Sequence, residues 1–273
     1  MSSVSTAIRE VLLTNEPRAK VMGARRVARE WKLGRLSCRN DVAMPDLPGR
    51  PERPELLPPN RMPKRGKAQS ERGRVALWHA LAHIEFVAID LALDMAGRFG
   101  KDMGEEFVGD FLHIAAEEAL HFTMIDRHLR SMGSYYGALA AHSGLWHAAH
   151  ETRHDVAARL AIVPMVLEAR GLDVTPPTLT RVQDSGDDRG ARILQRILDD
   201  EIRHVGTGVK HFIACAERTR QAPSALWKIL VLRHFRGSLK PPFNDSARRT
   251  AGLSREWYLG VVAATPSVLK PNS

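Results

Sequence analysis

The chain is poor in cysteine and has no long uncharged apolar run, and both absences narrow the class of protein. Its 273 residues include only Cys38 and Cys215, too few and too far apart for a disulfide framework or a cysteine-rich metal site. No stretch of about eighteen uncharged apolar residues occurs, and the first residues, MSSVSTAIRE, lack the apolar segment of a secretory signal. We therefore expect a soluble, cytoplasmic protein with no membrane span.

Charge is distributed unevenly along a chain whose composition, 44% hydrophobic and 26% charged, is that of a folded globular protein. Residues 1–70 hold 15 basic against 7 acidic residues, residues 71–216 hold 15 against 21, and residues 217–273 hold 10 against 3. An acidic centre between basic ends indicates a cation site inside and an exterior that faces anions or another subunit. A merely solubilising surface is the alternative for the basic ends.

Proline separates the N-terminal part of the chain from the rest. Seven of the 16 prolines lie within residues 45–63, so this segment, here called the strap, is predicted to be extended. Residues 6–33 before it are typical of one or two short helices broken near Pro17. Because the strap carries several leucines, we expect it to pack on the protein and, with the tail loop 239–245, to cover the active site. Mobile, solubilising ends are the alternative.

Apolar residues recur every three to four positions from Ser70 onward, which predicts helices. The long helices are expected at about 70–100, 104–133, 145–171 and 187–217, with shorter ones near 225–235 and 255–262. Residues 175–186, TPPTLTRVQDSG, are predicted to be a turn-rich connection, and no strand pair is expected. The predicted class is all-α, with an N-terminal segment 1–69, a four-helix bundle 70–217 and a C-terminal helical extension 218–273.

Glutamates interrupt the apolar faces of the four long helices. Glu85 has apolar residues at offsets −7, −4, −3, +3, +4 and +7, so its carboxylate points toward the core. Glu118, Glu168 and Glu201 interrupt apolar stripes in the same way. Burying an unpaired carboxylate costs several kcal/mol, so this pattern predicts a positive partner between the glutamates.

Two of these glutamates begin a Glu-x-x-His motif, Glu118 with His121 and Glu201 with His204. This spacing stacks a carboxylate and an imidazole on adjacent helical turns, so both can reach one metal ion. Four carboxylates and two imidazoles would supply the ligands of two divalent cations, whose charge would balance that of the carboxylates.

The spacing along the chain repeats as well. Glu85 precedes Glu118 by 33 residues, and Glu168 precedes Glu201 by 33. Two helical hairpins related by an approximate two-fold axis would produce this order. A single Glu-x-x-His motif is a weak signal, whereas the duplicated order on apolar stripes is a strong one.

This pattern resembles the ferritin-like di-iron carboxylate superfamily, in which two helices carry one Glu each and the other two carry Glu-x-x-His. The resemblance covers about residues 70–216. The segments HIEFVAID, AEEALHF, VLEARGLDVTP and DDEIRHVGTG are similar to a bacterial ferritin-like family of unknown function grouped near the tRNA-hydroxylase-like members. The resemblance implies a ferritin-like four-helix bundle and the following metal ligands: Glu85, Glu118, His121, Glu168, Glu201 and His204.

An acidic residue precedes each motif glutamate, Glu117 before Glu118 and Asp200 before Glu201. In many oxygen-activating relatives such an acid accepts a hydrogen bond from a ligand histidine, so the resemblance implies that role here, with Arg203 in the same network. Solvated or salt-bridged surface groups are an equally weighted alternative.

Oxygen-rich ligands with one imidazole per ion favour two iron ions, with manganese as the alternative, over zinc. Reduced iron pairs activate dioxygen, so the leading hypothesis is an oxygen-dependent oxidoreductase, a hydroxylase or oxidase of a small organic substrate with a separate electron donor. The alternatives are a non-catalytic ferritin-like metal-binding protein and a tRNA-modifying hydroxylase. RNA is the weaker partner because the basic ends hold few aromatic residues, and a homodimer is compatible with the sequence.

Two related activities are disfavoured. The radical-generating subunit of ribonucleotide reductase places a tyrosine four residues after its first ligand histidine, and here that position is Ile125. Iron storage requires a short bundle that closes into a shell, whereas this chain carries long segments on both sides of the predicted bundle.

Other histidines have structural explanations. His83, two residues from Glu85, points to a different helix face and is expected to be a packed or hydrogen-bonded core histidine, and His79 and His113 lie nearby in the sequence. A second cluster has spacings that could hold zinc but lies in a polar segment, where an exposed helix turn is the favoured interpretation. Its members are His147, His150, Glu151 and His154.

Overall fold

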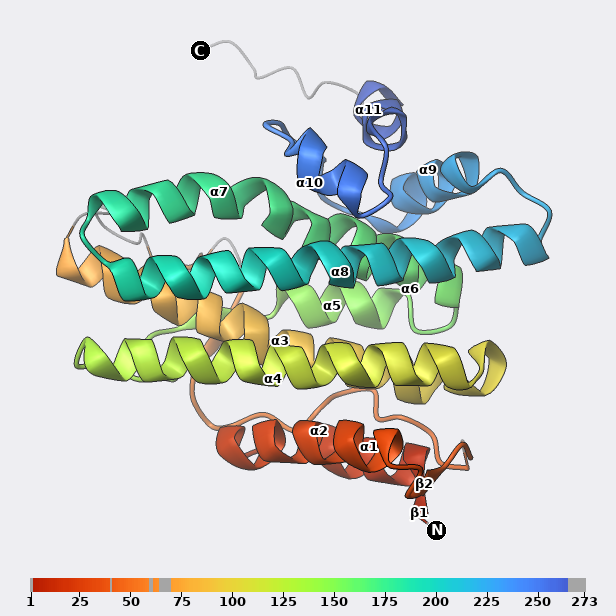
Figure 1. Cartoon of the computed structure of the whole chain (residues 1–273), viewed down its shortest axis with the longest axis horizontal. Coiled ribbons are helices and arrows are strands. Elements are labelled where there is room, and N and C mark those ends of the chain that lie inside the picture. Colours follow the sequence, from red (N-terminus) through yellow and green to blue (C-terminus); the bar gives the residue numbers. More distant parts are fainter. Residues whose placement is uncertain (1, 40, 59–60, 64–69, 265–273) are drawn as a thin grey trace. The chain divides into compact units, whose positions relative to one another are not determined.

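The computed structural model describes residues 2–39, 41–58, 61–63 and 70–264, which are mostly helical, and the predicted all-α class is confirmed (Figure 1). The strands in these ranges are two-residue parallel pairs, β1 (Ser2–Ser3) with β2 (Leu36–Ser37) and β3 (Leu56–Leu57) with β4 (Ala141–His142). The expectation of no strand pair is wrong at these two places. Strands of two residues are too short to show the alternating pattern by which a strand is predicted from sequence.

Contacts divide the chain into two compact units. Unit 1 comprises Met1–His150 and Leu179–Ile197, and unit 2 comprises Glu151–Thr178 and Leu198–Ser273. The division predicted from the sequence, at residues 69 and 217, stays a prediction.

Two N-terminal helices, α1 (Val4–Leu12) and α2 (Pro17–Lys32), confirm the predicted break near Pro17. Pro17 occupies the first turn of α2, where a missing backbone N–H costs nothing. The Glu16 side chain caps this helix by accepting from the N–H groups of Arg18 and Ala19. In unit 1 the two helices pack against α3 and α4.

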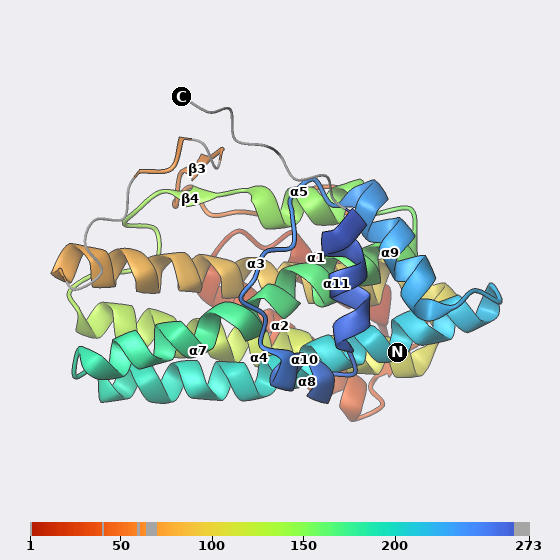
Figure 2. The same cartoon turned by 90° about the horizontal axis from the view of Figure 1, so that it is seen from above.

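Helices α3 (Glu71–Met103) and α4 (Glu105–Ser131) form a tight hairpin in unit 1 (Figures 1 and 2). Ser70 caps α3 as predicted, because its Oγ accepts from the Gly73 N–H at 3.1 Å. The helix continues past the expected end at residue 100, since Gly104, with φ of 91°, is the residue that turns the chain.

By length and composition, α3 is apolar enough to cross a membrane, but 67% of its most apolar stretch is buried inside the protein. This burial fits the core helix of a soluble protein.

The strap is pinned to unit 1 along its first half. Side chains elsewhere in the unit donate to its backbone carbonyls: Arg98 to Pro45 at 2.9 Å, Trp146 to Asp46 at 3.1 Å and Lys20 to Gly49 at 2.8 Å. Further along, β3 of the strap pairs with β4. The predicted packing of the strap is confirmed for these residues, while residues 59–60 lie outside the described part of the chain.

The predicted helix at 145–171 is helical over most of its length but is not continuous, because residues 152–155 separate α5 (Gly144–Glu151) from α6 (Val156–Ile162) and the π-helical segment Val163–Glu168. Asp155 starts α6 afresh, since its carboxylate accepts from the N–H groups of Ala157 and Ala158 at 2.9 and 3.1 Å. The helix does not end at Gly171 as predicted, because this residue lies within the next helix, α7 (Ala169–Asp184).

The predicted turn at 175–186 is also wrong, since α7 runs through Pro176 and Pro177 to Asp184. Pro176 cannot donate to the carbonyl of Leu172 four residues earlier. In unit 2 the Asn244 side-chain amide donates to that carbonyl at 3.1 Å instead. A tertiary hydrogen bond thus replaces the missing helical one.

Helix α8 (Asp188–Arg218) follows a short turn and matches the fourth predicted helix. The tail of unit 2 forms α9 (Pro223–His234), α10 (Asp245–Thr250) and α11 (Arg255–Ala264), of which α10 is too short to be evident from the sequence. The tail loop is packed within unit 2, because Arg170 donates to the Lys240 carbonyl at 2.8 Å and the Asn244 N–H donates to the Asp173 carboxylate at 2.9 Å.

Candidate metal centre

One group of predicted ligands gathers between α3 and α4 in unit 1. Glu85, Glu118 and His121 are 5%, 1% and 0% exposed, and each offers a ligand atom within 4.8 Å of the others. His121 Nδ1 lies 3.3 Å from a carboxylate oxygen of Glu85 and 3.3 Å from one of Glu118. The i, i+3 spacing of Glu118 and His121 brings both onto the face of α4 that packs on α3. This group could hold a metal ion.

The electrostatics of this group favour a cation. Burial raises the pKa of Glu85 well above its usual value, and the neighbouring Glu118 carboxylate raises it further, while His121 opposes the shift. Two carboxylates this deeply buried cannot both stay ionised without a positive charge beside them. The site therefore takes up either protons or a metal ion.

The second Glu-x-x-His motif, on α8 in unit 2, has the same distance between its imidazole and its carboxylate. His204 Nδ1 lies 3.3 Å from Glu201 Oε1, and the two residues are 1% and 9% exposed. Glu168 of the same unit is half-buried and is the last residue of the π-helical segment. Single-turn π segments inside helices occur frequently at functional sites, because the extra residue re-aims neighbouring side chains.

The acids that precede the motif glutamates have partners of their own. Asp200 is 1% exposed and accepts from Arg203 Nη2 at 2.6 Å. Glu117 lies 3.6 Å from the exposed His113. Their action on ligand histidines stays a prediction.

The structure thus assembles Glu85, Glu118 and His121 in one unit and brings Glu201 beside His204 in the other. That these residues and Glu168 together ligate metal stays a prediction.

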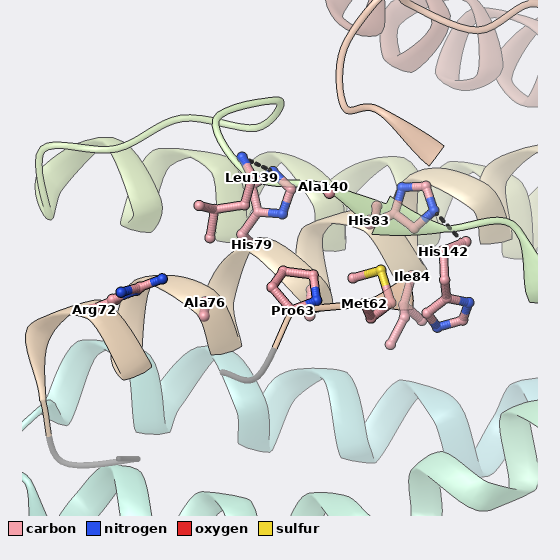
Figure 3. Close-up of a pocket in the computed structure, with 12 residues that line it drawn as sticks. Met62, Pro63, Arg72, Ala76, His79, His83, Ile84, Leu139, Ala140 and His142 are labelled. Carbon is pink, nitrogen blue, oxygen red and sulfur yellow. Dashed lines mark hydrogen bonds between the residues drawn. The ribbon is translucent and has the colours of Figure 1, made fainter. Parts of the chain in front are cut away.

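His79 and His83 are core residues that hold the segment after α4 (Figure 3). His79 Nε2 accepts from the N–H groups of Gly137 and Leu139 at 3.0 and 3.3 Å. His83 lies 3.0 Å from both the Tyr136 hydroxyl and the His142 carbonyl. Burial lowers the pKa of each histidine to about 4, so both are neutral at physiological pH. The structural interpretation of His83 is confirmed.

In the alternative zinc cluster, His147, His150 and Glu151 keep their helical spacing within α5, but His154 does not. Helix α5 ends at Glu151, so His154 lies beyond it. His147, Glu151 and His154 are exposed, which matches the favoured interpretation of an exposed helix turn.

Sequence analysis missed a buried charge network in unit 1. Asp90 is fully buried and pairs with both Lys20, at 2.6 Å, and Arg50 of the strap. Burial lowers the pKa of Lys20, and Asp90 opposes that shift. The signal was available, because an aspartate within the apolar run FVAIDLAL demands a buried cation.

Comparisons with known proteins place the chain in a family. The model of the family described as "Protein of unknown function (DUF455)" matches residues 13–259. A protein of Haemophilus influenzae with the printed name "Uncharacterized protein" is 39% identical over 229 residues, which is 81% of this chain and 79% of the relative. No solved structure matches the chain. The sequence prediction of a family of unknown function is confirmed, and the chain belongs to the DUF455 family.

Proposed function

We propose that this chain is a ferritin-like di-iron carboxylate protein that uses dioxygen to hydroxylate or oxidise an organic substrate. Glu85, Glu118 and His121 would supply one half of the ligand set, and the other half is Glu168, Glu201 and His204. Manganese is the alternative metal, because the same oxygen-rich ligands suit it.

The observation that carries the proposal is the matching geometry of the two motifs. In each, the histidine Nδ1 lies 3.3 Å from the carboxylate of the glutamate three residues earlier, and both side chains are almost fully buried. A motif glutamate that served only solubility would be exposed. Burial of both pairs, in an order repeated at 33 residues, supports a duplicated half-site.

Charge balance favours two divalent ions. Four carboxylates carry four negative charges, which two such ions would neutralise, and neutralisation removes most of the cost of burial. Burial and the neighbouring Glu118 carboxylate raise the pKa of Glu85, so a cation beside these two acids would stabilise their ionised forms.

The residues of the chain would position and shield the reaction. Reduced iron, when bound, supplies the electrons for dioxygen activation. Glu118 and His121 are held by adjacent turns of one helix, so their relative positions are fixed before metal binds. Phe111, Ile114 and Phe122, all buried on α4, would exclude bulk water.

The substrate is proposed to be a small organic molecule, with electrons from a separate donor. A cytoplasmic location fits two cysteines that form no disulfide.

Oxygen consumption tests the proposal. Protein loaded anaerobically with ferrous iron is mixed with oxygenated buffer and excess ascorbate, while an oxygen electrode and the optical spectrum are followed. We expect repeated oxygen uptake that exceeds the bound iron, and its loss in the double variant Glu118→Gln, Glu201→Gln, with His154→Gln unchanged. Uptake that stops once the bound iron is oxidised would favour the alternative, a metal-binding protein without turnover.

A further inference from the structure

A second candidate site lies on the outer side of α3 in unit 1. A cavity of about 380 Å³ is lined by strap residues, by α3 and by α5. Its α3 residues, His83 and Val87, are each two positions from Glu85, and two positions correspond to about 200° around a helix. The cavity and the Glu85 carboxylate therefore lie on opposite sides of α3. A volume of this size is within the range of small-molecule sites.

The cavity wall combines an apolar surface with one strong cation. Leu47, Leu56, Val87 and Trp146 supply the apolar part, and Arg50 supplies the charge. Ser143, His147 and His150 add polar groups. An apolar cavity with few polar groups is the usual composition of a site for a small organic ligand.

The charge at Arg50 is incompletely balanced. Its Nη1 donates to Asp90, but the same carboxylate also accepts from Lys20 at 2.6 Å. One carboxylate thus serves two basic side chains, and Arg50 cannot lose its proton. Within the described part of the chain, Arg50 makes its hydrogen bond through Nη1 to Asp90. Its other N–H groups can therefore donate to a ligand.

Arg50 is also held in place. Its guanidinium carbon lies 5.8 Å from the centre of the Phe86 ring and 5.9 Å from that of Trp146. The Trp146 indole is fixed in turn, because its Nε1 donates to the Asp46 carbonyl of the strap. A guanidinium fixed by an ion pair and two rings loses little entropy when it binds an anion.

We propose that this cavity binds a small organic carboxylate, with the carboxylate on Arg50 and an aliphatic or aromatic body against Trp146, Leu47 and Leu56. A single guanidinium matches the planar, singly charged carboxylate. The apolar wall selects molecules with a hydrocarbon body over small hydrophilic anions. This site does not depend on the proposed di-iron function, because no predicted metal ligand lines the cavity.

Binding of decanoate tests the proposal. Full-length, metal-loaded protein is titrated calorimetrically with decanoate below its micelle concentration, and with 1-decanol as the uncharged control. We expect one decanoate per chain and at least about tenfold weaker binding of decanol, since hydrogen bonds to a charged group distinguish the two. Absence of decanoate binding, or equal binding of decanol, would overturn the proposal.

Two variants locate the site. Arg50→Gln should remove the preference for decanoate over decanol. Leu47 is 72% exposed, so Leu47→Glu should fold normally and weaken decanoate binding at least about tenfold by placing a competing carboxylate near Arg50. Leu33→Glu, at a position 50% exposed and outside the cavity lining, is the matched control and should bind as the wild type does. Equal weakening by both leucine variants, or unchanged preference in Arg50→Gln, would contradict the assignment. Metal content, measured in parallel, reports on the di-iron proposal separately.

Discussion

Buried acids on α3 differ in the side chains that neutralise them. Asp90 pairs with Lys20 and Arg50, and Asp94 pairs with Arg98. Glu85 instead lies beside a histidine that also contacts Glu118. An acid paired with a permanent cation is already neutralised, whereas Glu85 needs a proton or a metal ion.

Replacing Asp90 should destabilise the protein strongly. In Asp90→Asn the buried Lys20 loses its counter-ion, and breaking a buried pair costs roughly 3 kcal/mol or more. Urea denaturation at pH 7 measures the free energy of unfolding. The exposed pair of Glu30 and Arg35 gives the control Glu30→Gln, which should change that energy by less than about 0.5 kcal/mol. An equal change in the free energy of unfolding of both variants would show that the buried network around Asp90 stabilises the protein no more than an exposed ion pair does.

His79 should make stability depend on pH. Its pKa is lowered to about 4 by burial, so below the ordinary value of 6.5 the unfolded chain binds a proton more tightly than the folded one. The contribution of His79 to the free energy of unfolding is therefore fully present above pH 6.5 and is lost as the pH drops toward 4.

Urea denaturation at pH 7 and pH 5 tests this expectation. The free energy of unfolding of the wild type should drop from pH 7 to pH 5. In His79→Gln this drop should be smaller by roughly 1–2 kcal/mol. His154→Gln, at an exposed position, should show the wild-type loss. If His79→Gln loses as much stability as the wild type, His79 does not titrate as described.

Replacing motif glutamates should empty the proposed metal site. We expect Glu118→Ala and Glu201→Ala each to lose both metal ions, because the proposal gives these paired glutamates a ligand role toward the two ions. Elemental analysis of the purified variants measures the loss, and His154→Ala is the control with unchanged metal. Loss of metal in His154→Ala, with metal retained in Glu201→Ala, would show that the metal is bound at the cluster around His154 and not by the motif glutamates.

At the scale of elements, the long helices without internal proline could be predicted from their apolar periodicity, whereas the helix that contains two prolines could not. The positions of α3, α4 and α8 follow from apolar periodicity and from caps such as Ser70, although α3 ends beyond the predicted residue 100. The helix through Pro176 and Pro177 could not be foreseen, because it relies on Asn244, which is distant in the sequence. Local propensity does not report such a tertiary hydrogen bond.

Gly208 provides a test of packing between elements of unit 2. A Cβ at this position would stand 2.4 Å from Pro164 Cβ, and the proline ring cannot move aside easily. Gly208→Ala should therefore lower the free energy of unfolding by roughly 1–3 kcal/mol.

Gly206→Ala is the matched control on the same helix. Its Cβ would come no closer than 3.7 Å to the Ala251 carbonyl oxygen, which is ordinary contact. Because alanine favours helix, this variant should be neutral or stabilised by up to about 1 kcal/mol. Equal effects of the two substitutions in thermal and urea denaturation would contradict the described packing.

At the scale of the whole molecule, the repeated order of motifs was the informative part of the sequence. Residue types and spacing sufficed to select Glu118 with His121 and Glu201 with His204, because i, i+3 contacts are local. The cavity at Arg50 could not be predicted, since it requires the strap to fold back onto α3 and α5. Such long-range contacts are fixed by tertiary packing, which sequence periodicity does not describe.

Metal content of the purified protein tests the central claim most directly. Elemental analysis is carried out on well-folded protein as isolated and after anaerobic incubation with ferrous iron or manganese, followed by removal of unbound ions. We expect close to two ions per chain, because four buried carboxylates require about that much positive charge. Folded protein that holds no metal and takes up neither ion would contradict it.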